Sequence, residues 1–177
     1  MANRIITISG KQFSGKDVVA KMLISHFTSF RRLALGDAIK LEYSKRKGLD
    51  LSEIEKNKHI YRPDLIALGD WGRSIDPDYW IKSVVNTPGD LVVPDLRMPR
   101  EYEVFRASNS FSIRVEASIE ARSKRGIIVN SDDITETALD SSNWDYMIFN
   151  NGTYEELSKI VDDLCPLIKT RLNIGQA

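Results

Sequence analysis

The sequence of 177 residues has little of what several classes of protein depend on. It contains one cysteine, Cys165, which excludes an internal disulfide and favours a reducing compartment. Its two histidines, His26 and His59, have no partners at ligand spacing, which indicates neither a zinc site nor a Ser-His-Asp triad. No apolar run approaches the ~20 residues of a membrane-spanning helix, and the amino terminus lacks the apolar stretch of a signal peptide. We therefore expect a cytoplasmic protein that does not enter a membrane.

The sequence also lacks an excess of charge of either sign, because 25 Lys and Arg residues balance 25 Asp and Glu residues. A protein that binds nucleic-acid polymers needs a basic surplus, so we do not expect that class. There is no internal repeat and no Gly/Ser-rich linker, and the length fits one domain with a sizeable core. Nothing in the sequence demands more than a monomer, and a dimer stays open.

A glycine-bounded segment at 10–17, GKQFSGKD, is the most informative part of the sequence. It follows an apolar run and precedes apolar residues at helical spacing, which is the layout of a phosphate-binding P-loop, GxxxxGK[ST]. Glycines let backbone N–H groups turn inward, and Lys16 brings a full charge to the phosphates of a nucleotide. Asp17 stands where Ser or Thr usually holds magnesium. The residues predicted to bind ATP in this segment are Gly10, Lys11, Ser14, Gly15, Lys16, Asp17 and Val18.

Segments with strand and helix patterns alternate along the chain. Strands are predicted at 5–9, 33–35, 91–93, 111–115 and 146–150, and helices at 17–27, 38–47, 63–73, 78–85, 99–108, 119–124 and 154–171. Such alternation predicts parallel strands joined by right-handed crossovers, with ligands at the carboxyl ends of the strands. We therefore expect an α/β protein, a three-layer α/β/α P-loop fold with a five-stranded parallel sheet. Residues 1–177 would form one domain, with a small helical lid at about 117–140.

An aspartate and two arginines follow the apolar strand predicted at 91–93. A strand that closes on an aspartate is the pattern that holds magnesium in P-loop enzymes, so Asp95 joins Asp17 as a predicted metal residue. Guanidinium groups match phosphate bidentately, which favours Arg97 at a substrate phosphate, with Arg100 beside it. A helix cap followed by solvated arginines is the alternative interpretation.

Two further arginines, Arg122 and Arg125, stand three residues apart and share one face of a short predicted helix. A closing lid needs such a pair, because phosphoryl transfer spreads negative charge over the equatorial oxygens. A charge run of this kind also fits an ordinary solvated helix face.

Two loops add candidates for the cleft. Arg73 precedes an Asp-Pro break, a position from which its side chain can point into the cleft. The turn that contains Asn151 and Gly152 follows the last predicted strand and places loop backbone beside the P-loop, where an adenine ring can rest. A plain capped turn explains the same residues nearly as well.

Taken together, the motifs resemble the animal-type phosphomevalonate kinases of the nucleoside-monophosphate-kinase superfamily over nearly the whole chain. They are SGKD at 14–17, Lys40 and Tyr43 before KGL at 47–49, WGR at 71–73, DP at 76–77, Asp95 with Arg97, Arg122 with RG at 125–126, DD at 132–133 with Glu136, LD at 139–140, WD at 144–145 and NG at 151–152. The family has a second arginine where this chain has Met98. The resemblance implies ATP and Mg²⁺, with Lys16 on ATP, and catalytic roles for Lys16, Arg97, Arg122 and Arg125. It also implies that the phosphorylated substrate is bound by Lys40, Arg73, Arg97 and, in place of the missing arginine, Arg100.

Phage-type deoxynucleoside monophosphate kinases are similar too, and they share the SGKD loop and the aspartate and arginine after the third strand. The two resemblances imply transfer of the ATP γ-phosphoryl group to a phosphate of a small molecule. Phosphomevalonate is the first expectation for the acceptor, and a deoxynucleoside or nucleoside monophosphate is the alternative. A non-catalytic nucleotide-binding module is a further alternative.

Overall fold

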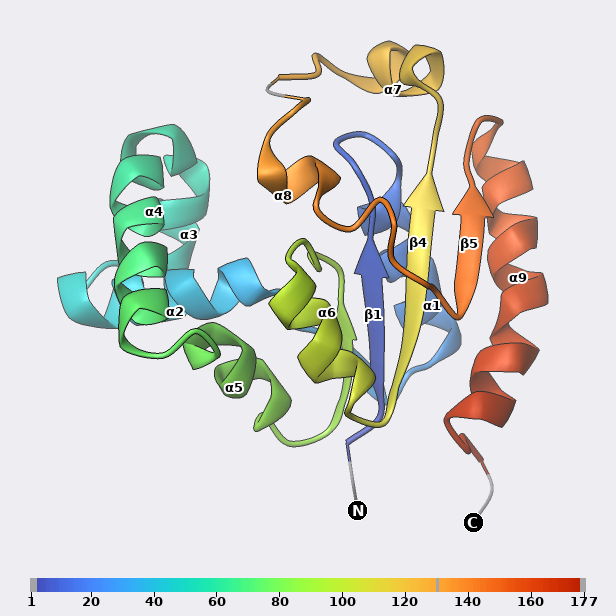
Figure 1. Cartoon of the computed structure of the whole chain (residues 1–177), viewed down its shortest axis with the longest axis horizontal. Helices are drawn as coiled ribbons and strands as arrows, with labels where there is room; N and C mark the ends of the chain where they lie inside the picture. Colours follow the sequence, from blue (N-terminus) through green and yellow to red (C-terminus); the bar gives the residue numbers. More distant parts are fainter. Residues whose placement is uncertain (1–2, 130, 176–177) are drawn as a thin grey trace. The chain divides into compact units, whose positions relative to one another are not determined.

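A computed structural model describes residues 3–129 and 131–175 of the chain. Within these residues, five parallel strands form one sheet in the order β2-β3-β1-β4-β5 (Figure 1). The strands are β1 (Ile5–Ser9), β2 (Phe30–Arg32), β3 (Asp90–Val93), β4 (Ser110–Glu116) and β5 (Tyr146–Phe149). The predicted five-stranded parallel sheet is therefore confirmed. Ser9 at the end of β1 is in register with Arg114 of β4, so the P-loop begins beside that arginine.

Helices connect the strands within the described residues. They are α1 (Lys16–His26), α2 (Leu35–Lys47), α3 (Leu51–Lys56), α4 (Lys58–Ile75), α5 (Tyr79–Val85), α6 (Pro99–Arg106), α7 (Ile119–Arg125), α8 (Ile134–Thr137) and α9 (Tyr154–Arg171). Most predicted elements lie within a few residues of these bounds. The strand predicted at 33–35 is wrong, because the chain pairs at Phe30–Arg32 and Ala34 already caps α2. The helix α3 was not predicted.

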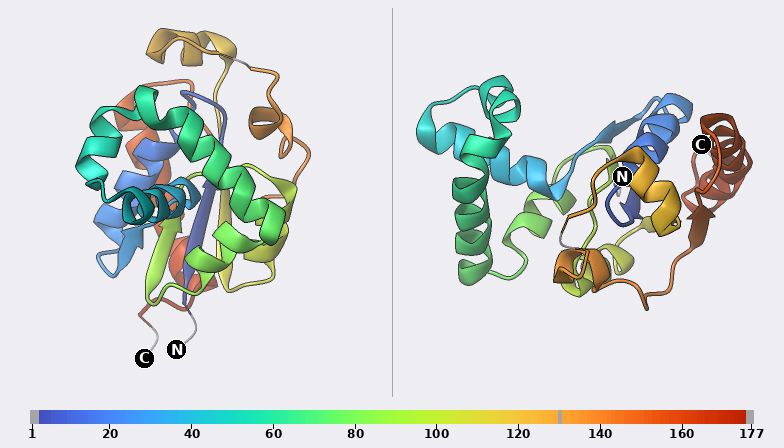
Figure 2. Two further views of the ribbon diagram at one scale, coloured as in Figure 1. Left: turned by 90° about the vertical axis from the view of Figure 1, so that its left-hand side faces the viewer. Right: turned by 90° about the horizontal axis from the view of Figure 1, so that it is seen from above.

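Helices cover both faces of the sheet, as predicted for three layers. On one face, α1 and α9 bury a continuous apolar core together with β1, β4 and β5. The apolar positions of α9 recur at helical spacing, at Leu157, Val161, Leu164 and Ile168. On the other face, α6 packs against β4 (Figure 2). Because both faces are covered, the carboxyl ends of the strands are where functional loops gather.

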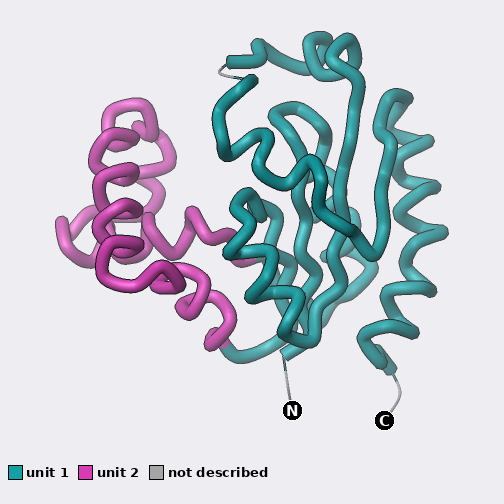
Figure 3. Tube along the Cα trace, viewed as in Figure 1, with its two compact units in different colours: residues 1–32, 88–177 teal, residues 33–87 magenta. Residues whose placement is uncertain are grey.

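The described chain divides into two compact units (Figure 3). The first joins the chain up to Arg32 with the chain from Pro88 onwards and contains the sheet, and the second is Leu33–Thr87. The second unit has an apolar core of its own, made by Tyr43, Ile54, Leu68 and Trp80. The expectation of one kinase domain with a lid at about 117–140 stays a prediction. None of the helices in the described part of the chain is long and apolar enough to cross a membrane.

Candidate active site

The segment between β1 and α1 folds as a tight loop whose two glycines are both needed. Gly15 has φ +100°, a left-handed conformation, and a Cβ added there would lie 2.3 Å from Nδ2 of Asn150. A Cβ added at Gly10 would lie 2.5 Å from the Oγ of Ser14 and from the carbonyl oxygen of Val115. The loop is therefore held close to the ends of β4 and β5, as a P-loop at the edge of a parallel sheet requires.

Lys16 is the first residue of α1 and lies among charged neighbours. Burial lowers the pKa of Lys16, and the positive charge of Arg97 lowers it further. The carboxylates of Asp17, Glu136 and Asp95 act in the opposite direction and raise that pKa. The loop thus has a partly buried ammonium group with a second cation near it, an environment that a bound anion would stabilise.

The two predicted metal residues stand on different elements. Asp17 is exposed in the first turn of α1, and Asp95 is half-buried after β3. Within the described residues, no three His, Cys, Asp or Glu side chains gather as ligands for a metal ion. Mg²⁺ in phosphate-transfer sites is commonly held by one or two carboxylates, substrate phosphates and water. Two hard carboxylates beside a phosphate loop fit that pattern, and their role stays a prediction.

The arginines of α7 lie against the P-loop. Arg122 is only 8% exposed, and its Nη1 donates to the carbonyl oxygen of Gln12 at 3.4 Å. Its Nε is buried and has no hydrogen-bond partner among the described residues. Arg125 donates from Nη1 to the carbonyl oxygen of Phe13 at 3.3 Å and from Nη2 to that of Asn150 at 2.8 Å. Because Arg122 is buried, the alternative interpretation of these arginines as an ordinary solvated helix face is wrong for this residue.

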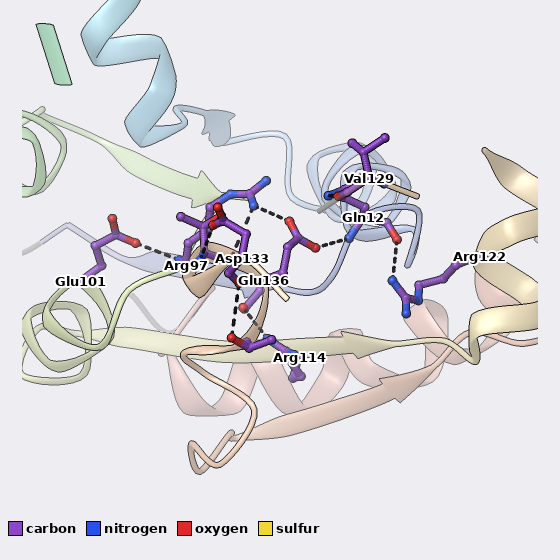
Figure 4. A network of polar contacts seen from close by, with 11 residues as sticks. Gln12, Arg97, Glu101, Arg114, Arg122, Val129, Asp133 and Glu136 are labelled. Carbon is purple, nitrogen blue, oxygen red and sulfur yellow. Dashed lines mark hydrogen bonds and ion pairs between the residues drawn. The ribbon is translucent and has the colours of Figure 1, made fainter. Parts of the chain in front are cut away.

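Arg97 is paired with a glutamate of α8. Its Nη1 donates to Oε1 of Glu136 at 2.7 Å, while Oε2 of Glu136 accepts the main-chain N–H of Gln12 at 2.7 Å (Figure 4). The carboxylate of Glu101 accepts the main-chain N–H groups of Arg97 and Met98 and so begins α6. The predicted contact of Arg97 with a substrate phosphate stays a prediction.

The other predicted basic residues also have acidic neighbours. Lys11 of the P-loop forms an ion pair of 2.6 Å with Asp140, and the exposed Arg100 lies 3.7 Å from Glu103. In the second unit, Lys40 binds Asp37 and Glu55, and Arg73 binds Asp70 at 2.7 Å. The assignment of Lys40, Arg73 and Arg100 to the acceptor stays a prediction.

Two hollows lie within the first unit, and the second of them is lined by the P-loop. One, of about 400 Å³, is lined by Ser118, Glu120, Ala121, Lys124, Arg125, Asn151 and Gly152. The other, of about 500 Å³, is lined by Gln12, Phe13, Gly15, Lys16, Asp17, Val18 and Arg125. Arg125 lines both, so a single side chain of α7 links the P-loop to the turn that was predicted to hold an adenine.

Sequence reasoning missed Asn150, which the structure places at the centre of this arrangement. Its side-chain Nδ2 donates to the carbonyl oxygen of Ser14 at 2.8 Å, and its main-chain N–H donates to that of Glu116 at 2.7 Å. The neighbouring Asn151 instead accepts the main-chain N–H of Ser118, the residue that caps α7, at 2.7 Å. The signal in the sequence that could have identified Asn150 is its position directly after β5, at the carboxyl end of a parallel strand.

The sheet and the loop at the end of its first strand define a P-loop protein of the kinase type. The sequence model "phosphomevalonate kinase" matches residues 8–111, and "deoxynucleotide monophosphate kinase" matches residues 69–161, each more than half of the chain. The chain therefore belongs to the phosphomevalonate kinase and deoxynucleotide monophosphate kinase families, whose models overlap on residues 69–111 of it.

Solved structures support the same fold at low sequence identity. Shikimate kinase from Aquifex aeolicus is 16% identical, with 96% of this chain and 98% of that chain covered and a TM-score of 0.52. Shikimate kinase from Acinetobacter baumannii, in complex with shikimate, is 12% identical, with coverages of 96% and 94% and a TM-score of 0.56. The APS kinase CysC of Mycobacterium tuberculosis, in complex with AMPPNP and APS, is 15% identical, with coverages of 93% and 98% and a TM-score of 0.50. These likenesses show the fold.

Proposed function

We propose that this protein is an ATP-dependent kinase that transfers the γ-phosphoryl group to a phosphate oxygen of a small molecule, with phosphomevalonate as the first candidate. The observation that carries the proposal is the buried guanidinium of Arg122, which lies against the P-loop with its Nε unpaired. A buried guanidinium N–H without an acceptor is costly, so an anion at this place offsets the cost. The phosphates of a nucleotide in the P-loop are such an anion.

The proposed chemistry is in-line transfer between two phosphates. The acceptor oxygen is already anionic near neutral pH, so the protein has to position the reactants and balance charge rather than remove a proton. Lys16 and the P-loop amides hold the ATP phosphates, and Arg97, Arg122 and Arg125 balance the charge that develops. Asp17 and Asp95 would hold Mg²⁺, directly or through water, and the ion would add positive charge at the phosphates.

The hollow of about 400 Å³ beside Asn151 and Gly152 is the proposed place for the adenine of ATP. Its walls combine loop backbone, which offers hydrogen bonds to a base edge, with the side chains of Lys124 and Arg125. A guanidinium group stacks favourably on a flat ring. This assignment puts the base on one side of Arg125 and the phosphates on the other.

A nucleoside or deoxynucleoside monophosphate is the second candidate acceptor. The match of residues 69–161 to the deoxynucleotide monophosphate kinase model favours it. Met98 also favours it, because the resemblance to phosphomevalonate kinases requires a second arginine at that position.

An ADP-release assay with Mg·ATP, across phosphomevalonate and a panel of nucleoside and deoxynucleoside monophosphates, tests the proposal. We expect one acceptor class to be used, and Lys16→Ala to lower turnover by roughly 10²- to 10³-fold with the fold intact. Lys169→Ala on the exposed face of α9 is the control and should behave as wild type. ATP binding without turnover on any acceptor would favour a non-catalytic nucleotide-binding module. A fully active Lys16→Ala variant would show that the P-loop takes no part in the reaction.

A further inference from the structure

Glu136 is a buried carboxylate whose two oxygens are bound to two different parts of the first unit. Its side chain is 5% exposed, and such carboxylates persist in protein interiors only when they are paired. One oxygen accepts from Arg97, which follows β3, and the other accepts the main-chain N–H of Gln12 in the P-loop (Figure 4). Glu136 thus joins the arginine predicted to bind phosphate to the loop predicted to bind ATP.

The carboxylate also lies near two positive charges, those of Arg97 and Lys16. Arg97 and Lys16 are near enough for the charge of Arg97 to lower the pKa of Lys16, whereas Glu136 raises it. Two such cations repel each other, and that repulsion favours outward rotation of the Arg97 side chain, which is 35% exposed. A fixed anion paired with Arg97 offsets that repulsion and keeps Arg97 in place before any phosphate arrives.

We propose that Glu136 is a positioning residue that holds the Arg97 guanidinium, and with it the Gln12 amide, in the orientation that receives a phosphate. Both contacts of that guanidinium within the described residues are made by Nη1, to Glu136 and, at 3.5 Å, to the carbonyl oxygen of Thr135. Nε and Nη2 are therefore left for a phosphate. The role in phosphoryl transfer rests on the proposed function, whereas the holding of Arg97 does not.

The opposite role for Glu136 is that of a competitor that must leave Arg97 when phosphate binds. The second oxygen argues against it, because a bond to the main chain of the P-loop fixes the carboxylate independently of Arg97. The Gln12 side chain fixes this part of the loop further, since its Nε2 donates to the carbonyl oxygen of Val129 at 2.6 Å. If Glu136 positions Arg97, removing the charge of Glu136 should slow phosphoryl transfer. If Glu136 competes with phosphate for Arg97, removing that charge should improve binding of the acceptor.

Whether Glu136 holds Arg97 can be tested without an activity assay, by NMR of the full chain and of its Glu136→Gln and Glu136→Ala variants. Gln keeps an oxygen for the Gln12 amide but loses the charge that holds Arg97. We expect the Gln12 amide to stay protected in Glu136→Gln and to exchange about tenfold faster or more in Glu136→Ala. The Arg97 side-chain N–H signals should show restricted rotation in wild type and fast rotation in both variants. Unchanged Arg97 signals in Glu136→Gln would overturn the proposal, and that variant suffices if Glu136→Ala does not fold.

The effect on transfer is tested by a double-mutant cycle with Glu136→Gln and Arg97→Ala, using the best acceptor found in the ADP-release assay. We expect Glu136→Gln to lower kcat about tenfold with little change in the KM for ATP, and to add nothing when Arg97 is already Ala. Additive losses would indicate a structural role, and tighter acceptor binding would indicate competition, so either result overturns positioning. Asp162→Asn, which removes an exposed carboxylate of α9 that lies 2.8 Å from Nε2 of His26 in α1, is the matched control. If wild type transfers phosphate to no acceptor, the proposed function fails, and the NMR result alone decides whether Glu136 holds Arg97.

Discussion

At the scale of single residues, the P-loop keeps its shape through a side chain from far along the chain. Asn150 uses its Nδ2 to bind the carbonyl oxygen of Ser14, and it occupies the space that a Cβ at Gly15 would fill. Arg125 approaches the same asparagine, with Nη2 at 3.4 Å from its Oδ1. The amide therefore acts as a donor to the P-loop and an acceptor from Arg125 of α7, a combination that a carboxylate cannot supply.

We predict that Asn150→Asp weakens nucleotide binding more than Asn150→Ala does. The alanine variant leaves the Ser14 carbonyl oxygen with only the longer contact from Nη1 of Arg125, at 3.5 Å, and should lower the free energy of unfolding by about 1–2 kcal/mol. The aspartate variant adds repulsion between its carboxylate and that carbonyl oxygen. Titration calorimetry with ADP and urea unfolding measure the two effects, and Asn109→Ala in the exposed turn before β4 is the control. Equal affinities for ADP in all three variants would show that Asn150 does not shape the P-loop.

The sequence indicated some of these residues and missed others for one physical reason. A local pattern specifies Gly10, Gly15 and Lys16, because the turn and the helix start use residues that are adjacent in the chain. Asn150 and Glu136 lie more than one hundred residues from their P-loop partners, and only the completed sheet brings them together. For the same reason, the pairing of Arg97 with Glu136 was not predicted.

At the scale of elements, α7 begins with a cap and ends against the P-loop. The Ser118 Oγ accepts the main-chain N–H of Ala121 at the start of the helix. At its end, a Cβ added to Gly126 would lie 2.2 Å from the ring of Phe13. Phe13 has φ +60°, a left-handed backbone conformation that is strained for a bulky residue. The P-loop therefore contains backbone strain at the residue whose ring packs against Gly126. The glycine at 126 is needed for space, because its own φ of 175° is open to any residue.

We predict that Gly126→Ala displaces α7 from the P-loop and lowers kcat about tenfold, because Arg125 is the neighbouring residue and moves with it. Phe13→Gly removes both the ring and the strain of a left-handed phenylalanine, so it should restore most of that loss in the double variant. ADP release with the best acceptor measures the effect, and Ser123→Ala on the exposed part of α7 is the control. A double variant no better than Gly126→Ala would show that the Phe13 ring is not what the new methyl group meets.

The elements themselves were predictable where apolar spacing was strong, as in α9 and β4. The strand at Phe30–Arg32 was not, because two exposed arginines occupy a strand at the edge of the sheet, while the more apolar residues after it begin α2. Hydropathy alone favours the wrong segment in such a case. Edge strands tolerate charge because only one side of their backbone is paired.

At the scale of the whole molecule, alternating strands and helices were enough to predict the three-layer parallel fold. The division into two compact units was not predicted, because a helical segment within an α/β chain carries the same local pattern as a crossover helix. In the first unit, an ion pair joins the central strand β1 to its neighbour β3 at the end of the sheet opposite the P-loop. Arg4, which precedes β1, binds Asp90 of β3 through Nε at 3.0 Å and Nη2 at 2.5 Å. The Ser29 hydroxyl also donates to Asp90, at 3.1 Å.

This ion pair makes the stability of the sheet depend on pH in a direction that the structure determines. Burial raises the pKa of Asp90, but the hydrogen bonds and charge of Arg4, with the Ser29 hydroxyl, outweigh it and hold the pKa below the usual 3.8. A carboxyl whose pKa is lowered on folding contributes stability above its unfolded pKa and loses it as the pH falls through the folded value. We predict that Asp90→Asn lowers the free energy of unfolding by about 1–2 kcal/mol near neutral pH.

The difference between wild type and Asp90→Asn should shrink as the pH falls below about 4, because protonation then removes the same charge from wild type. Urea unfolding at about pH 7, 5 and 3 measures it, with Asp163→Asn on the exposed face of α9 as the control. The control should match wild type at every pH, since its carboxylate lies in solvent. A difference that stays constant down to about pH 3 would show that the shape of the Asp90 side chain, rather than its charge, fastens β3 to β1.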